Sequence, residues 1–551
     1  MADLSFDVVI IGGGCKGLAV GAYLAKYGGM SIGIFDEAHE LGGGMAGEQS
    51  APGFQANPHS NSQMDWYYNI VIKDDLPELW EEGFKTTGMQ SILANLFPDE
   101  TCLAIYGFKQ DPDGNRTYAQ IARFSERDAE TWLKFRKLYL ERVRPAFYEE
   151  VFSLPPQPGE PGAVMKVLLS DPAFKKAGLD PQLAGMTPLQ ALNSTFESEE
   201  LIVSFLRMNQ IMGMYCDDAG LALPVILTNM EGFTHSMIEG GTHNYAHAMF
   251  RVLYKYGARA FTHSEVEKVL IENGKAVGIQ LKNGSQVKAR KAVISTLSPH
   301  QLCYDLIGKD YVSPEIIKKI DAIETDRTCV TWYDWAFTEY PKFKAHDFNS
   351  DVDSDETYAG VTVYTLGVKS IQSIVDECAT RKNHKMPLDP LVALSTDPSS
   401  AHLTRDPRHC VAHSETSSPP AWAFPDEWWI KFQHEFAEHL MNKFQEFMTN
   451  MSWDKVAGVI PVTTYYIAKH LKNMAPSGNW QVIDFIPSQM GANRPIPELA
   501  RHRTPIQNLY ATGSAWGSWA SSSCCSAYTC YKVMAEDYGL RKPWEEQGRP
   551  Y

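Results

Sequence analysis

A glycine pattern close to the start of the chain constrains the fold more than any other feature. Gly12-x-Gly14-x-x-Gly17 directly follows Val8 to Ile11, an unbroken apolar run typical of a strand buried on both faces of a parallel sheet. Glycine at these positions allows a sharp turn, close approach of the backbone to a diphosphate, and tight packing of helix on strand. A helix beginning at about Cys15 would point its first N–H groups at that diphosphate. The pattern predicts a Rossmann-like dinucleotide site.

The residues after the turn complete this prediction. Ser31 to Phe35 reads as the next strand, and Asp36 ends it about twenty residues past the glycines, where a carboxylate accepts the ribose hydroxyls. Glu37 is an alternative shifted by one residue, but Asp36 fits the strand end better. A second match, Gly42-x-Gly44-x-x-Gly47, has no strand before it and no apolar helix after it, so we reject it. One credible dinucleotide motif remains.

Composition narrows the class of partner. The 551 residues suffice for two or three domain-sized cores, and a net charge of −16 argues against a nucleic-acid partner. Ten cysteines without paired spacing predict reduced thiols in a cytoplasmic protein, with no zinc or other metal site. We expect no signal peptide and no membrane-spanning helix, because no run of about eighteen uncharged apolar residues occurs. Any membrane contact would be peripheral.

Changes of pattern along the chain predict two interleaved domains. From Asp74 to about Gly232 the apolar residues follow helical spacing, without signals for parallel strands. Farther on, Asn273-Gly274 and Asn283-Gly284 are flanked by alternating apolar residues, which predicts a meander of strands. Val330 to Phe337 and Leu391 to Ser395 also read as strands. We predict a dinucleotide domain of residues 1–73, 233–299 and 486–540, a second domain of 74–232 and 300–485, and a tail of 541–551.

One long helix of the second domain carries an apolar stripe. Ordinary core packing is the favoured interpretation over a membrane-surface helix, because the opposite face is acidic. His434 and His439 on this helix lie about 140° apart around its axis and so predict no metal site. The stripe comprises Phe432, Phe436, Leu440, Phe444 and Phe447.

Three separated blocks resemble one family. They are the glycine block with Asp36, the Gly240-Gly241 helix with its meander, and the tail Asn493-Arg494-Pro495 to Gly513. Together they resemble the phytoene desaturase-like FAD-dependent oxidoreductases, which include carotenoid desaturases and retinol saturases. The glycine pair six residues past Asp36 also resembles the extended signature of the glutathione-reductase structural group. The resemblance implies an α/β fold: a Rossmann-like FAD domain with a discontinuous α+β substrate domain, binding FAD and no separate NAD(P)H.

The resemblance also implies which residues contact FAD. The first glycine turn would contact the diphosphate, Asp36 the ribose, and the second glycine turn the diphosphate and ribityl side. A small-residue helix from Ala520 would place its positive end at the flavin. The implied contacts are Gly12, Gly14, Gly17, Asp36, Gly43, Gly44, Met45, Val266 (adenine), and Gly513, Ser518, Trp519 and Ala520 (flavin edge).

One departure from the family bears on the substrate. Carotenoid desaturases usually carry a Pro-Gly-Gly turn after Gly513, whereas this chain has Trp516-Gly517-Ser518-Trp519. Trp516 and Trp519 would narrow a pocket beside the flavin. We therefore expect a small apolar substrate, cyclic or isoprenoid, in place of a long carotenoid.

The implied reaction moves a hydride from a C–H bond to flavin N5 and leaves a C=C bond. His59 and His243 are candidate catalytic bases, although a structural role is the alternative for each. Electrons would pass to oxygen or a quinone. Two further hypotheses stay open: a flavin oxidase of an amine or alcohol, and a non-catalytic carrier of prenyl groups.

Overall fold

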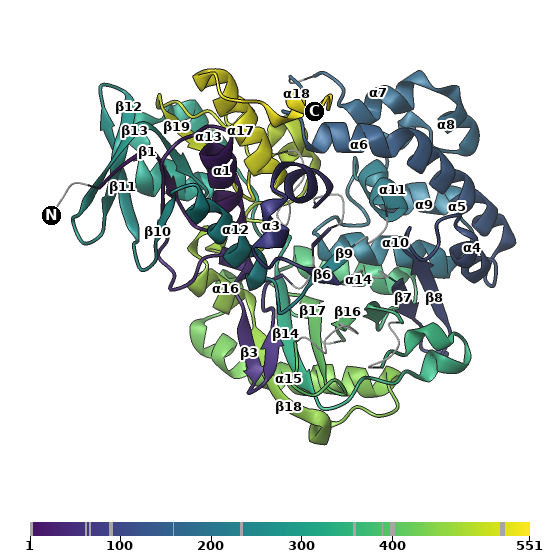
Figure 1. The fold of residues 1–551 in the computed structure, drawn as a ribbon. Coiled ribbons are helices and arrows are strands. Elements are labelled where there is room, and N and C mark those ends of the chain that lie inside the picture. Colours follow the sequence, from purple (N-terminus) through teal and green to yellow (C-terminus); the bar gives the residue numbers. More distant parts are fainter. Residues whose placement is uncertain are drawn as a thin grey trace.

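Two seven-stranded sheets and a layer of helices make up the part of the chain that the structure describes (Figure 1). The structure, a computed structural model, describes residues 4–60, 63–64, 68–87, 92–157, 159–231, 235–355, 360–387, 389–396, 403–517 and 524–551. The strands of the first sheet come from both ends and the middle of the chain. The C-terminus lies near the helices that cover this sheet.

The first sheet carries the glycine turn at the end of its central strand. In β1 (Leu4–Ile11), Val8 to Ile11 are at most 3% exposed, as the unbroken apolar run predicts. β1 pairs in parallel with β2 and β13 on its two sides. The other strands of this sheet are β2 (Ile32–Phe35), β10 (Arg259–Phe261), β11 (Val266–Glu272), β12 (Lys275–Leu281), β13 (Gln286–Ser295) and β19 (Leu509–Ala511).

The predicted meander forms the antiparallel edge of this sheet. β11, β12 and β13 pair in antiparallel order through the two Asn-Gly turns. Asn273 and Gly274 take φ values of 50° and 75°, the left-handed conformation that a tight hairpin requires. The hairpin prediction is therefore confirmed at both the strands and the turn.

Helix α1 (Cys15–Lys26) joins the N-terminal turn to the C-terminal part of the chain. It packs between α12 (His243–Lys255) and α17 (Cys525–Tyr538), and all of its residues from Cys15 to Ala25 are buried. The ring of Tyr23 lies 5.6 Å from that of Tyr528 and 5.2 Å from that of Tyr531. These contacts bring the tail back onto the helix that follows the glycine turn.

The second sheet is built from residues far apart in sequence. The strand predicted at Val330 to Phe337 is found there as β14. The expectation that residues 74–232 contain no parallel strand is wrong, because β7 pairs in parallel with β15. This pairing joins segments about 270 residues apart, so no local pattern announces it. In spatial order the strands are β18 (Val456–Val462), β14 (Val330–Phe337), β17 (Cys410–Ser417), β16 (Val392–Thr396), β15 (Val363–Leu366), β7 (Ile92–Leu96) and β8 (Cys102–Tyr106).

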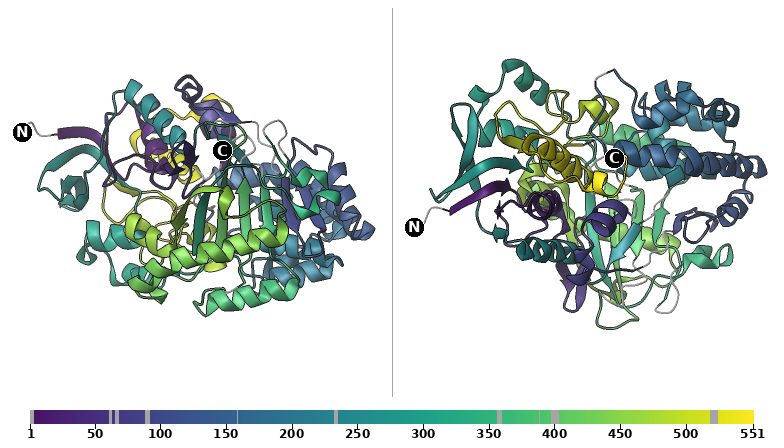
Figure 2. Two further views of the ribbon diagram at one scale, coloured as in Figure 1. Left: turned by 90° about the horizontal axis from the view of Figure 1, so that it is seen from below. Right: turned by 45° about the horizontal axis from the view of Figure 1, so that its top comes forward.

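The two faces of the second sheet differ in character. One face packs against α15 (Asp426–Phe447), which runs across the sheet (Figure 2), and the rings of Trp335 and Phe444 lie 5.2 Å apart there. The predicted core role of the stripe is confirmed, since Phe436, Leu440, Phe444 and Phe447 are buried. On the opposite face, alternation along β14 and β17 places polar side chains.

Helices and short strands complete the molecule. Polar N-caps such as Ser125, Thr187 and Ser198 accept the first free N–H groups of α5, α9 and α10. The division into two interleaved domains stays a prediction. The remaining elements are α3 (Glu78–Glu81), α4 (Asn115–Ile121), α5 (Glu126–Leu138), α6 (Arg144–Val151), α7 (Ala163–Ser170), α8 (Pro172–Ala177), α9 (Pro188–Thr195), α10 (Glu199–Ile211), α11 (Ala222–Glu231), α13 (Pro314–Asp321), α14 (Ile371–Lys382), α16 (Thr464–His470), α18 (Pro543–Glu546), β3 (Glu48–Ala51), β4 (Phe54–Ala56), β5 (Gln63–Met64), β6 (Thr86–Thr87) and β9 (His235–Ile238).

Within the described ranges, no helix is both long and apolar enough to span a lipid bilayer. All ten cysteines are buried.

Candidate functional site

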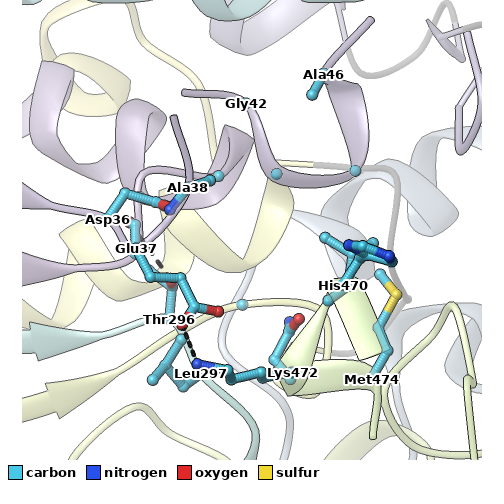
Figure 3. A pocket seen from close by; sticks show the side chains of 18 of the residues that line it. Asp36, Glu37, Ala38, Gly42, Ala46, Thr296, Leu297, His470, Lys472 and Met474 are labelled. Atoms are coloured by element: carbon cyan, nitrogen blue, oxygen red, sulfur yellow. Dashed lines mark hydrogen bonds and ion pairs between the residues drawn. The ribbon is translucent and has the colours of Figure 1, made fainter. Parts of the chain in front are cut away.

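A cavity of about 1010 Å³ lies where the two ends of the chain meet the second sheet. The cavity is lined from the N-terminal part by Gly12, Gly14 to Gly17 and Gly42 to Glu48, and from the C-terminal part by Gly513 and Ser514. Figure 3 shows Asp36 and Glu37 on one side, and His470 and Met474 across from them. The structure therefore brings together the head and tail segments that the sequence predicted to share a cofactor.

The glycines of the first turn differ in the room they leave for a side chain. A Cβ on Gly17 would lie 2.1 Å from the carbonyl oxygen of Gly12, and Gly12 itself has a φ of 94°. A Cβ on Gly14 would meet no protein atom closer than 3.9 Å, so Gly14 borders open space. Helix α1 starts directly after it, with no acidic residue in its first turn and no side-chain cap. Free N–H groups facing a cradle of bare backbone fit a dinucleotide diphosphate.

Asp36 stands at the end of β2, beside the glycine turn. Its Oδ2 accepts the N–H of Gly13 at 2.6 Å and its Oδ1 accepts the N–H of Ala38 at 2.8 Å. The neighbouring Glu37 is instead paired with Lys472, whose Nζ lies 2.5 Å from Glu37 Oε2. Asp36 thus lies beside the glycine turn at the cavity with no cationic partner among the described residues, whereas Glu37 is paired with Lys472. The contact of Asp36 with the ribose stays a prediction.

The second glycine turn packs on the first. The N–H of Gly42 donates to the carbonyl of Gly13 at 2.9 Å, and residues Gly43–Met45 form a turn of 3₁₀ helix. No strand leads into this turn, in agreement with our rejection of it as a second dinucleotide motif. Gly43, Gly44, Met45, Val266 and Gly513 all line the cavity. Their contacts to FAD stay predictions, and Ser518, Trp519 and Ala520 lie outside the described residues.

The two candidate bases differ in position. His59 lines the cavity, and burial together with the charges of His413 and His470 lowers its pKa to about 4. His243 begins α12 behind the second glycine turn, packs its ring on that of His247 at 5.1 Å, and is not among the cavity-lining residues. Only His59 is thus in a position to meet a substrate directly.

Trp516 does not support the predicted pocket role. Its side chain is 1% exposed and belongs to the hydrophobic core around Val293, Leu509 and Ala511. It is absent from the residues that line the cavity. The sequence could not distinguish a core position from a pocket position for Trp516, because a large apolar ring suits both.

The sequence missed an aromatic wall on the far side of the cavity. Trp332 of β14, Tyr466 and His470 of α16, and Trp480 all line it. The ring of His59 lies 5.7 Å from that of Trp332 and 6.3 Å from that of Tyr466, and Tyr466 lies 4.1 Å from His470. The spacing of Tyr466 and His470, four residues apart on one helix face, was the one local signal available.

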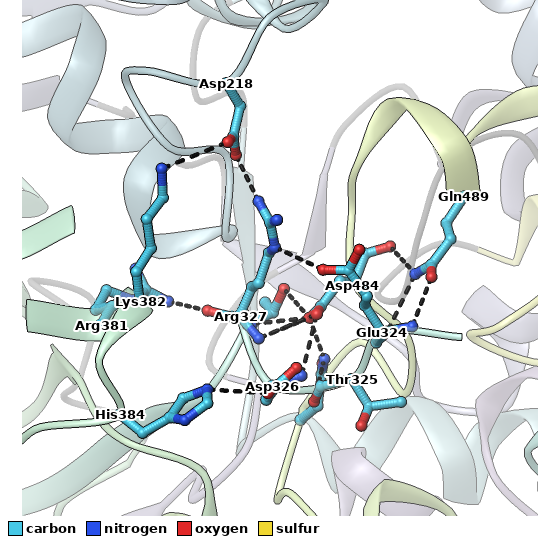
Figure 4. Close-up of polar contacts among 12 residues, drawn as sticks. Asp218, Glu324, Thr325, Asp326, Arg327, Arg381, Lys382, His384, Asp484 and Gln489 are labelled. Carbon is cyan, nitrogen blue, oxygen red and sulfur yellow. Dashed lines mark hydrogen bonds and ion pairs between the residues drawn. The ribbon is translucent and has the colours of Figure 1, made fainter. Parts of the chain in front are cut away.

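A buried polar node connects the second sheet to the cavity segment of the first. Asp484 accepts the N–H groups of Asp326, Arg327 and Thr328 just before β14 (Figure 4). Arg494, which is fully buried, donates to the carbonyls of Gln481, Ile483, Asp484 and Gln489, and to that of Ser514 at 2.9 Å. The Asn-Arg-Pro motif of the tail therefore holds the segment that lines the cavity at Gly513 and Ser514.

The described residues contain no cluster of three or more His, Cys, Asp or Glu side chains placed to hold a metal ion.

Comparisons with known proteins agree with this geometry. A family model described as an NAD(P)-binding Rossmann-like domain matches residues 10–69. One of the subunits of limonene dehydrogenase from Castellaniella defragrans is 24% identical, and the match covers 98% of this chain and 96% of that protein. The 4,4'-diapophytoene desaturase (4,4'-diapolycopene-forming) of a Methylomonas species is 24% identical over 57% of this chain and 56% of its own. Cyclohexylamine oxidase from Brevibacterium oxydans IH-35A has a similar fold, with a TM-score of 0.57 at 13% identity over 98% of this chain and all of that one.

The fold, the glycine cradle and these relatives define the class of the protein. It is an FAD-dependent oxidoreductase with a Rossmann-like α/β fold, and its resemblance to the phytoene desaturase type is confirmed. The relatives differ in what their names say they act on, so the substrate is a separate question.

Proposed function

We propose that the protein dehydrogenates carbon–carbon bonds of a small apolar substrate with a cyclic or isoprenoid skeleton. The observation that carries this proposal is the aromatic wall of Trp332, Tyr466, His470 and Trp480, which faces the glycine cradle across one cavity. The flat rings of this wall suit an apolar, compact ligand, and the charged side chains of Glu48, Lys469 and Lys472 line the same cavity. The names limonene dehydrogenase and diapophytoene desaturase, carried by relatives, point to the same substrate class.

Each part of the cavity has its own task in this proposal. Bound FAD would supply a hydride acceptor at its N5 atom. The first sheet holds the diphosphate on backbone N–H groups and the ribose on Asp36. The aromatic wall positions the substrate and excludes water, and Arg494 holds the Gly513–Ser514 segment in place. Electrons then leave to oxygen or a quinone.

A specific contact keeps the amine or alcohol oxidase as the second candidate. The hydroxyl of Tyr466 donates to Glu48 Oε1 at 3.3 Å, so a carboxylate stands beside the aromatic wall and could pair with a substrate ammonium. The prenyl carrier is set aside, since the relatives are named as enzymes.

The test starts from the protein as purified. Denaturation should release FAD, and anaerobic mixing of the intact protein with limonene should bleach the flavin, whereas cyclohexylamine and putrescine should not. Bleaching by the amines alone, with peroxide formed in air, would establish the oxidase instead. A protein that neither contains nor takes up FAD would refute both.

A matched pair of tryptophan variants tests the wall. Trp480→Leu should slow bleaching by limonene at least tenfold and leave the FAD content unchanged, because Trp480 lines the cavity. The control is Trp453→Leu, since Trp453 is 39% exposed on the surface. Equal rates in the two variants would contradict a substrate role for the wall.

A further inference from the structure

Lys16 is a buried cationic residue within the first glycine turn. It is the second residue of α1, lies between Gly14 and Gly17, and lines the cavity. Only 8% of its surface is exposed. Taking an ammonium group out of water costs free energy unless an opposite charge pairs with it. A lysine at this position therefore requires an anion.

No carboxylate among the described residues pairs with Lys16. The first turn of α1 contains no acidic residue. Lys16 is in this respect unlike the other described lysines at the cavity, whose charges are already neutralised. Each of those three pairs with a carboxylate: Lys282 with Glu265 at 2.6 Å, Lys469 with Asp426 at 3.1 Å, and Lys472 with Glu37 at 2.5 Å.

The cavity as a whole is unfavourable for a negatively charged ligand. Among the described residues that line it, seven have carboxylate side chains and four are lysines, with no arginine. The whole chain has a net charge of −16. Such a field repels a diphosphate, and the N-terminal end of a helix offers only about half a positive charge against it. A full cationic charge at the glycine turn would offset this repulsion.

The side chain of Lys16 begins at the cradle that fits a diphosphate. Gly14 borders open space there, and the first N–H groups of α1 face the same space. The charge of Lys16 acts on Cys15, which also lines the cavity. A hydrogen bond with Cys524 is the main cause that lowers the pKa of the Cys15 thiol to about 6; burial opposes this, and the charge of Lys16 adds to the lowering. The ammonium group is thus close to the start of the helix.

We propose that the ammonium group of Lys16 binds the diphosphate of FAD, in addition to the backbone of the glycine turn. The glycine pattern leaves the residue type at position 16 open, so this contact is a property of this chain and not of the pattern. The inference depends on FAD binding and is independent of the substrate proposed above. Flavin bleaching by limonene tests the substrate, whereas the experiments below measure cofactor binding, so either proposal can fail alone.

The first experiment titrates the apoprotein with FAD. Lys16→Met should raise the Kd at least about tenfold, the usual loss for a hydrogen bond to a charged group, whereas Lys16→Arg keeps the charge and should stay within about fivefold. The control is Lys469→Met, because Lys469 lines the same cavity but already pairs with Asp426 and is 55% exposed. Its Kd should change less than about threefold. Equal Kd values for Lys16→Met and wild type, or equal losses in Lys16→Met and the control, would overturn the proposal.

Competition experiments test which part of FAD the lysine meets. ADP carries the diphosphate and adenosine does not. ADP should inhibit FAD binding to the wild-type apoprotein, and its inhibition constant should rise at least about tenfold in Lys16→Met, whereas that of adenosine should not change. ADP that inhibits both proteins equally, or neither, would overturn the contact with the diphosphate.

A double-mutant cycle tests Cys15 as a different partner for the lysine. In a Cys15→Ala background, Lys16→Met should still raise the Kd for FAD at least about tenfold, since the thiol is not the anion that Lys16 binds. If the effect of Lys16→Met vanished in this background, Lys16 would act through the Cys15 thiolate and the proposal would fall.

Thermal unfolding of the apoprotein separates this role from a structural one. Lys16→Met removes a buried charge that has no carboxylate partner and keeps an apolar side chain, so the Tm of the apoprotein should stay the same or rise. A Tm lower by more than about 5 °C would show that Lys16 serves the fold, and would overturn the proposal. If Lys16→Met yields no folded protein, Lys16→Gln takes its place in all of these measurements.

Discussion

The two sheets contribute to the cavity in different ways. The first sheet presents backbone, through turns at Gly12, Gly43 and Gly513 that all take positive φ values. The second sheet and its flanking helix present side chains, above all the rings of Trp332 and Tyr466. A backbone cradle suits a cofactor whose phosphates are always the same, whereas side chains can be exchanged to suit a substrate. Substitutions in the glycine turns of the first sheet, the first half of the site, should therefore alter FAD content. Substitutions of the rings from the second sheet and its helix, the second half, should alter the rate of reaction.

The largest loss of stability is expected at Arg494, in the buried polar node that connects the two halves of the site. Arg494→Met removes a charged donor from five carbonyls, among them that of Ser514, and should destabilise the protein by roughly 3–5 kcal/mol, because buried carbonyls that lose a partner are costly. Urea unfolding and FAD content would measure this, and both should change together.

Arg503→Met is the matched control for this variant. Arg503 pairs with Asp537 at 2.7 Å, but its side chain is 48% exposed, so its loss should cost less than about 1 kcal/mol. If Arg494→Met were as mild as the control, the two halves would not depend on this node.

The contrast between a backbone half and a side-chain half also explains which parts of the site the sequence could predict. The glycine turn, Asp36 and the Asn273-Gly274 hairpin are local, since each depends on backbone conformations within a few residues. Their positions were predicted correctly.

The second half of the site depends on register between distant strands. Asp334 and His413 are 79 residues apart, and no local pattern shows that their strands pair. Trp516 was assigned to the pocket from its place in the segment after Gly513, where the related family has a Pro-Gly-Gly turn, but it lies in the core. Long-range pairing decides which face a side chain meets, and a one-residue shift of register would reverse it.

The second prediction concerns how the stability contributed by Asp484, in the buried polar node between the two halves, changes with pH. Burial raises the pKa of Asp484 to about 6 from an ordinary value of 3.8. The folded state therefore binds this proton more tightly than the unfolded state, and the stability that Asp484 contributes is lost as the pH rises from about 4 to about 6. The difference amounts to about 3 kcal/mol.

Asp484→Asn removes this titration. The unfolding free energy of the variant, relative to wild type, should rise by about 3 kcal/mol between pH 4 and pH 7 in urea experiments. Asp537→Asn should show a slope of the opposite sign, and mainly below about pH 4, because burial raises the pKa of Asp537 less than the hydrogen bonds from Arg503 and Tyr510 lower it. Parallel pH profiles for the two variants would contradict the assignment.

The third prediction separates folding from cofactor binding within the glycine turn. Gly17→Ala places a Cβ 2.1 Å from a backbone oxygen and should destabilise the protein by about 3 kcal/mol. Gly14→Ala meets no protein atom within 3.9 Å, so it should fold normally and yet lose FAD, because its methyl group projects into the cradle. Thermal unfolding of the apoprotein and FAD titration distinguish the two. A Gly14→Ala protein with normal FAD affinity would place the diphosphate elsewhere.

The smallest effect is expected at Asp36, the side chain that we assign to the ribose, and it concerns the affinity for FAD. Asp36→Ala removes the carboxylate that we assign to the ribose and should weaken FAD binding by about 1.5–2 kcal/mol, roughly tenfold to thirtyfold in Kd, as expected for a hydrogen bond to a charged group. Glu37→Gln is the control one residue away, and since Glu37 already pairs with Lys472 it should leave Kd within about threefold. Fluorescence titration of the apoprotein with FAD measures both. A larger loss in Glu37→Gln than in Asp36→Ala would reverse the assignment. In that event Lys472 would be the residue that holds Glu37 away from the ribose until FAD binds.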